Sequence, residues 1–75
     1  MKYYVFETEK VNEQQAFLVT PKDTYEGACG LFHQILASAY SNSNLTYALV
    51  MIIDEQGNTI DKSGINRQTE QTQEE

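Results

Sequence analysis

Residues 45–53 read Leu45-Thr46-Tyr47-Ala48-Leu49-Val50-Met51-Ile52-Ile53, which is a strand pattern with apolar side chains on both faces. A strand of this kind has to be buried on both sides. The chain contains only one good amphipathic helix, and one helix can cover only one face of a sheet. The sequence therefore predicts a second apolar face that another chain covers, either a second copy or a different protein.

One segment has the apolar spacing of that helix. We expect it to begin at an N-cap formed by Asp23 or Thr24 and to end at Tyr40 or Ser41. Apolar residues recur inside it at helical spacing and form one stripe. The stripe consists of Ala28, Leu31, Phe32, Ile35, Leu36 and Ala39.

Three further segments have the composition of strands. Residues 2–8 and 16–20 are predicted to form a hairpin whose loop is longer than two residues. Pro21 is expected to end the second of these strands, because proline has no N–H to donate to a neighbouring strand. Residues 59–62 follow a predicted turn at residues 54–58 and form a short edge strand.

The predicted fold is α+β with the element order ββαββ, one helix packed on a four-stranded, mainly antiparallel sheet. If the first strand lies between the second and the third, all neighbouring strands are antiparallel and the sheet order is 2-1-3-4. Residues 1–62 form this single small domain. Residues 63–75 are polar and acidic with Ile65 as their one apolar side chain, so we expect a flexible tail.

Side chains alternate along a strand, so each strand offers two faces. In the first strand we assign Tyr4, Phe6 and Thr8 to the helix side, and the side that carries Glu7 and Glu9 to the opposite face. In the central strand, either set of alternate residues is a candidate for the interface. The predicted interface residues, on the face away from the helix, are Tyr3, Val5, Tyr47, Leu49, Met51 and Ile53.

The net charge of the 75 residues is −6, and the acidic residues are spread along the chain. Nucleic acids and anionic membranes require clustered Lys and Arg, so we expect neither as a partner. The apolar run 45–53 is too short to span a bilayer, and residues 1–6 do not read as a signal peptide. We therefore expect a cytoplasmic protein.

Three groups of residues have some catalytic or metal-binding character. Cys29 and His33 lie one helical turn apart, as a nucleophile and its base would, but no third residue or oxyanion element accompanies them. Glu7 and Glu9 form a charged strand face that we expect to be solvated. The turn at residues 54–58 lacks the alternating oxygen ligands of a calcium loop. The sequence thus predicts no enzyme, no cofactor and no metal site.

Several short motifs carry a family resemblance. They are Met1-Lys2-Tyr3-Tyr4-Val5, Phe17-Leu18-Val19-Thr20 with Asp23-Thr24, Phe32-His33-Gln34-Ile35-Leu36-Ala37-Ser38-Ala39, and Asp54-Glu55-Gln56-Gly57-Asn58. Over residues 1–61 the chain resembles small uncharacterised proteins encoded by phages and prophages of Firmicutes. The resemblance implies a phage-encoded accessory or structural protein, in the host cytoplasm or associated with the virion, and it carries over no functional residues.

The function that we expect is that of a noncatalytic, self-associating protein–protein interaction module, most simply a homodimer. A host or phage protein is the alternative partner. A second hypothesis gives the acidic charge a direct role: the chain would inhibit a host protein by occupying its basic groove, as a nucleic-acid mimic or a counter-defence protein does. Binding of that kind weakens steeply with salt, whereas an apolar assembly does not.

Overall fold

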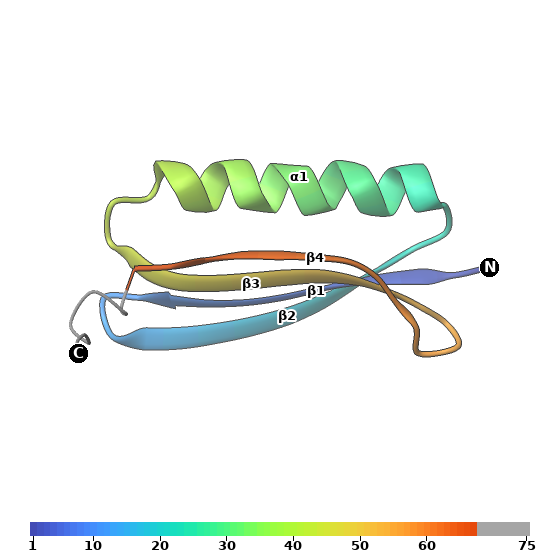
Figure 1. The fold of residues 1–75 in the computed structure, drawn as a ribbon, viewed down its shortest axis with the longest axis horizontal. Coiled ribbons are helices and arrows are strands. Elements are labelled where there is room, and N and C mark those ends of the chain that lie inside the picture. The colour runs from blue at the N-terminus through green and yellow to red at the C-terminus, as the bar shows by residue number, and fades with distance from the viewer. Residues whose placement is uncertain (68–75) are drawn as a thin grey trace.

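The computed structural model describes residues 1–67 of the chain as one sheet with one helix on it. The elements are β1 (Tyr3–Val11), β2 (Gln14–Lys22), α1 (Tyr25–Ser41), β3 (Leu45–Asp54) and β4 (Thr59–Asn66). The sheet order is β2-β1-β3-β4, and all neighbouring strands are antiparallel. Helix α1 lies along one side of the sheet (Figure 1). The predicted α+β fold, its ββαββ order and its sheet order are confirmed.

The hairpin between β1 and β2 is tighter than the sequence analysis predicted. Its loop consists of Asn12 and Glu13, with φ values of 52° and 70°. Positive φ at both loop residues is the signature of a type I′ turn, whose twist matches that of the two strands. Val11 and Gln14 are paired directly across it. The expectation of a longer loop is therefore wrong, because Asn12 tolerates the left-handed conformation that a two-residue loop requires.

Pro21 lies within β2 and does not end it. The strand continues to Lys22, and Pro21 is paired with Tyr4. In a two-residue hairpin the pair that flanks the loop is hydrogen-bonded, and hydrogen-bonded pairs then alternate along the ladder. By that alternation the missing N–H of Pro21 points away from β1, where no strand of residues 1–67 lies. An edge strand accepts proline at such a position.

Helix α1 is capped by Thr24, one of the two predicted residues. Its side-chain Oγ1 accepts a hydrogen bond from the backbone N–H of Gly27 at 3.0 Å. The helix ends at Ser41, as predicted. Its buried residues are Ala28, Phe32, Ile35 and Ala39, whereas Leu31 and Leu36 are only partly buried at its flanks.

The core lies entirely between α1 and the sheet, in two adjoining clusters. Both draw on the same side of β3, whose alternation places Ala48, Val50 and Ile52 toward the helix. The first cluster consists of Val5, Ala28, Phe32, Ile35, Val50 and Ile52, and the second of Ala39, Leu45, Ala48 and Ile65.

The predicted face assignment of β1 is wrong. Val5 is fully buried against α1, so the side of β1 that carries Val5, Glu7 and Glu9 is the helix side. The two carboxylates remain partly exposed there, although Val11, at the end of the same strand, packs against the core beside α1. Leu18, the β2 partner of Glu7 on the same side, is 56% exposed. A charged strand face can thus belong to the helix side where the neighbouring strand β2 is left exposed.

Strand β4 is longer than predicted and reaches Asn66. Ile65 is buried beside Ala39 and Ala48. A Cβ on Gly64 would clash with the carbonyl oxygen of Ala48, so β4 lies close to β3 at this position. The boundary predicted at residue 62 therefore cuts through β4, and residues 63–66 are strand. The rest of the predicted tail, residues 68–75, lies outside the described residues.

Candidate functional site

The side of the sheet opposite α1 carries the candidate site. Within residues 1–67 the helix lies on the other side only, and no further segment covers this one (Figure 1). Among the residues that the alternation and register of the strands place on it are nine adjoining ones, which we call the open face. They are Tyr4, Phe6, Thr8, Phe17, Val19, Tyr47, Leu49, Met51 and Ile53.

Phe6 lies at the centre of the open face. It is paired with Val19 on β2 and with Met51 on β3, so the three strands contribute adjoining apolar side chains. Its ring contacts that of Phe17 edge to face, with centroids 5.0 Å apart and an interplanar angle of 64°. Phe17 and Val19 are nevertheless 66% and 43% exposed. The open face is therefore continuous, and its β2 side meets water.

The open face contains no carboxylate, although the chain is acidic overall. The charged side chains that the described strands place on this side are Lys10, paired with Tyr47, and Lys62, paired with Met51. Glu7 and Glu9 lie on the helix side of β1. Two copies could consequently stack through this face without bringing carboxylates together.

The structure brings four of the six predicted interface residues together. Tyr47, Leu49, Met51 and Ile53 share one side of β3 and all belong to the open face. Tyr3 and Val5 do not lie with them, because both pack against the helix side of the core. The ring of Tyr3 lies 5.8 Å from that of Tyr25.

Sequence analysis missed the aromatic half of the open face. Tyr4 and Phe6 were assigned to the helix, and Phe17 and Val19 were not assigned to the interface. The available signal was Phe17-Leu18-Val19, a run that is apolar on both faces in the same way as β3. This run indicates that β2 contributes to the interface. Which side of β1 contributes cannot be found in the same way, because it depends on where the helix crosses the sheet.

Cys29 and His33, which lie one helical turn apart, do not bond to each other in the structure. Cys29 is half-buried and interacts with Tyr25, and their hydrogen bond raises the pKa of the Tyr25 hydroxyl. The imidazole of His33 instead contacts the ring of Phe32, with centroids 5.3 Å apart. Each of the two residues has an aromatic neighbour in place of the other.

Glu7 and Glu9 line a shallow groove on the helix side of the hairpin, together with Ala16, Phe17 and Leu18. Partial burial raises the pKa of the Glu7 carboxyl, and the neighbouring charge of Glu9 raises it further. Within residues 1–67 no three His, Cys, Asp or Glu side chains gather as metal ligands. Nor is any helix in this part of the chain long and apolar enough to cross a membrane.

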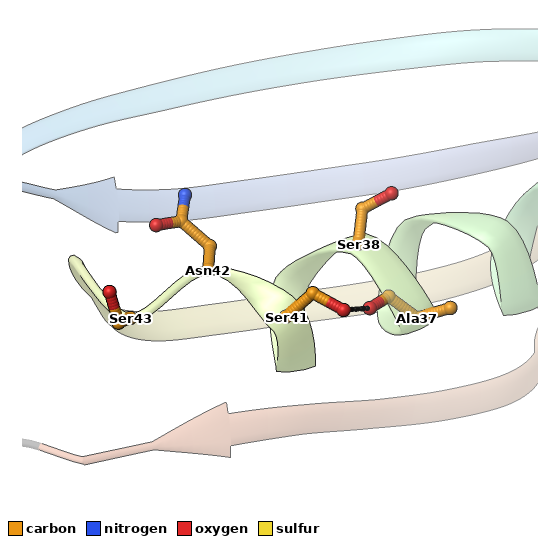
Figure 2. Close-up of a pocket in the computed structure, with 5 residues that line it drawn as sticks. All are labelled: Ala37, Ser38, Ser41, Asn42 and Ser43. Carbon is orange, nitrogen blue, oxygen red and sulfur yellow. Dashed lines mark hydrogen bonds between the residues drawn. The ribbon is translucent and has the colours of Figure 1, made fainter.

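A second hollow lies at the C-terminal end of α1 (Figure 2). Two of its polar side chains form hydrogen bonds within the chain. The Ser41 hydroxyl donates to the carbonyl of Ala37 at 3.1 Å, and Oδ1 of Asn42 accepts from the N–H of Asn44 at 3.0 Å. Ser38 and Ser43 complete the lining. This hollow follows from the way the helix ends and contains no titratable side chain.

Arg67 binds the same end of α1 from another part of the chain. Its Nη1 donates to the carbonyls of Asn42 and Leu45, both at 2.8 Å, and its Nη2 donates to that of Tyr40 at 3.3 Å. Its backbone N–H also donates to Thr46 at 2.7 Å. Of these carbonyls only that of Tyr40 belongs to the helix, and that of Asn42 also accepts from the N–H of Leu45 at 3.2 Å, so the guanidinium ties the last turn to the segment that leads into β3. Sequence analysis could not find this cap, because Arg67 follows the last strand.

Comparison of the chain with known proteins finds no matching family model, no matching curated protein and no matching solved structure. The resemblance to proteins of Firmicute phages and prophages therefore stays a prediction.

Proposed function

We propose that this chain is a noncatalytic interaction module that self-associates by stacking the open face of its sheet on that of a second copy. The observation that carries the proposal is the apolar cluster around Phe6, whose ring contacts Phe17 and which is paired with Val19 and Met51, on a side that has no cover within residues 1–67. Burial of apolar surface contributes about 25 cal/mol per Å², and uncovered apolar patches of this kind mark interfaces.

A second copy fits this face better than a basic partner does. The open face has no carboxylate, so the acidic charge of the chain would not draw a basic groove onto it. Its lysines, Lys10 and Lys62, lie at the ends and margin of the patch, where their long side chains can reach water in a stacked pair. A role as a phage accessory or structural protein is part of this proposal, and it rests on the sequence resemblance alone.

The test is the mass of the protein in solution, measured by light scattering during size exclusion for the wild type, Met51→Lys and Gln34→Lys. We expect the wild type to have at least the mass of two chains and to keep it in high salt. Met51→Lys should halve that mass, because Met51 is the β3 neighbour of Phe6 in the same sheet and the change buries a charge at the centre of the stacked interface. In a free chain the new ammonium group would remain solvated, so the fold should survive.

Gln34→Lys is the matched control, because it adds the same charge on the exposed side of α1 and should leave the mass unchanged. A monomeric wild type, or a Met51→Lys protein with the wild-type mass, would overturn the proposal. A wild-type mass that falls steeply as salt rises would instead favour an electrostatic contact.

A further inference from the structure

Strand β2 exposes both of its faces and its outer backbone edge. Phe17 and Val19 on the open side are 66% and 43% exposed, and Leu18 on the helix side is 56% exposed. β2 is an outer strand of the sheet, so one row of its N–H and C=O groups has no partner strand within residues 1–67. Exposed edges of this kind are templates for pairing with another chain.

The hairpin determines which backbone groups point outward. Because Val11 and Gln14 flank a two-residue loop, the hydrogen-bonded pairs of β2 are those at Gln14, Ala16, Leu18, Thr20 and Lys22. The outward N–H groups are consequently those of Gln15, Phe17 and Val19. Pro21 has none, and the loop lies before Gln15. The usable edge is thus symmetric about Phe17.

The two edges of the sheet differ in how they are protected. Strand β4 has a register shift at Ile60 and carries Asp61 and Lys62 in its middle, and both devices discourage strand pairing. Residues 14–20 of β2 carry no charge, and their pairing with β1 has no irregularity. Two acidic chains can approach each other at this strip without like charges meeting.

We infer that β2 pairs antiparallel with the β2 of a second copy, in a register centred on Phe17, and so joins two sheets edge to edge. In that register Phe17 lies opposite its own symmetry mate, Gln15 opposite Val19, and Ala16 opposite Leu18. All the outward N–H groups of both strands find acceptors. The exposure of Leu18 indicates that α1 leaves room for the second strand on the helix side.

This edge is a different surface from the open face. The two contacts together join two edge-paired sheets face to face, and the resulting assembly is a tetramer. Edge pairing alone gives a dimer. The inference therefore depends on the proposed stacking of open faces only for the expected mass of a tetramer.

The experiment is disulfide trapping between two single-cysteine chains, both in a Cys29→Ser background. One carries Ala16→Cys and the other, marked by a tag of different mass, carries Leu18→Cys. These positions form a non-hydrogen-bonded pair in the proposed register, with Cα atoms about 4.5 Å apart. That separation lies within the range for a disulfide, roughly 4.4–6.8 Å. Both side chains are on the helix side, where stacking of the open faces cannot bring them together.

We expect mild oxidation of the mixture to give mainly the mixed dimer on a non-reducing gel. Each variant alone is the matched control and should link far less, since its cysteine lies diagonally from its symmetry mate, about 7–8 Å away. Mixed and self-linked products in the proportion of random pairing would overturn the register. The absence of linked product at a concentration where the wild type is oligomeric would overturn the edge.

A second pair of variants separates the two surfaces. Gln15→Pro removes one outward N–H at a residue outside the nine of the open face, and should halve the wild-type mass. Repeating the trapping in a Met51→Lys background should preserve the mixed dimer. If Met51→Lys abolished trapping, edge pairing would depend on stacking and would fail as an independent contact. If trapping persisted while Met51→Lys kept the wild-type mass, edge pairing would stand and stacking would fall.

Discussion

Glu7 and Asp54 are carboxylates on the helix side of the sheet whose pKa values move in opposite directions. Partial burial beside Glu9 raises the pKa of Glu7, because no donor compensates its lost hydration. Asp54 accepts hydrogen bonds from the N–H groups of Asn58 and Gln56, both at 2.9 Å, and these bonds lower its pKa. The local supply of N–H donors decides the sign of each shift.

We predict that Glu7→Gln raises the melting temperature at neutral pH. The pKa of Glu7 is raised above its ordinary 4.5 in the folded chain, so ionisation disfavours the folded state as pH rises through that range. Below pH 4.5 both states are protonated, and the gain should disappear. Thermal melts of both proteins at neutral and acidic pH measure the difference.

Glu13→Gln is the control for this prediction, because it removes an exposed charge at the hairpin turn. It should shift the melting temperature much less than Glu7→Gln does. A Glu7→Gln protein that melts below the wild type at neutral pH would show that Glu7 is stabilised by a contact rather than destabilised by burial.

At the scale of elements, helix α1 depends on a residue outside itself. Its last turn contains no basic side chain. The guanidinium of Arg67 supplies the positive charge and bonds the carbonyls of Tyr40, Asn42 and Leu45. A cation at a helix C-terminus interacts favourably with the helix dipole as well as with the free carbonyls. The end of β4 and the end of α1 are therefore tied together.

We predict that Arg67→Ala lowers the free energy of unfolding by about 1–2 kcal/mol, the range for a charge-assisted cap of a helix end. Arg67→Lys should recover part of the loss, because an ammonium group keeps the charge but cannot reach all three carbonyls. Urea unfolding of the three proteins measures the effect. Lys62→Ala, which removes a positive charge from the same strand, is the control, and an equal loss in Lys62→Ala would contradict the capping role.

At the scale of the whole molecule, residues 1–67 form two layers, the helix and the sheet. The apolar residues on both faces of β3 are typical of a sheet that is covered on both sides, as the middle one of three layers is. The helix covers one side of β3, and the other side remains open within residues 1–67 (Figure 1). The short core of such a chain provides limited stability, so assembly is a further source of it. Stacking of open faces and pairing of β2 edges would both remove apolar surface from water.

Hydrogen exchange provides a prediction for the assembly as a whole. The outward N–H groups of Phe17 and Val19 should exchange more slowly as protein concentration rises, because the second copy supplies acceptors for them. The inward N–H groups of Ala16 and Leu18 already donate to β1 and should respond much less. Amide-resolved exchange at two concentrations checks this. Equal responses in the two sets would mean that no strand is added at this edge.

Much of the fold could be predicted because its signals are local. The helix after Thr24, the strand over 45–53 and the turn before Thr59 each depend on a few neighbouring residues, and each was confirmed. Apart from the face assignment of β1, the errors fell on strand ends and on the hairpin loop. Pro21 and residues 63–66 look unfavourable for strands when taken alone, but an edge position accepts the first and a neighbouring β3 orders the second.

For residues 1–67, the sequence by itself determined one helix, a four-stranded antiparallel sheet and more apolar strand surface than one helix can cover. Only the tertiary structure decided which side of β1 faces the helix, that Phe6 and Phe17 meet on the open face, and that Arg67 caps α1. The physical reason is that alternation specifies two faces for each strand without saying which is buried. That choice depends on the line along which the helix crosses the sheet, and long-range packing alone sets that line.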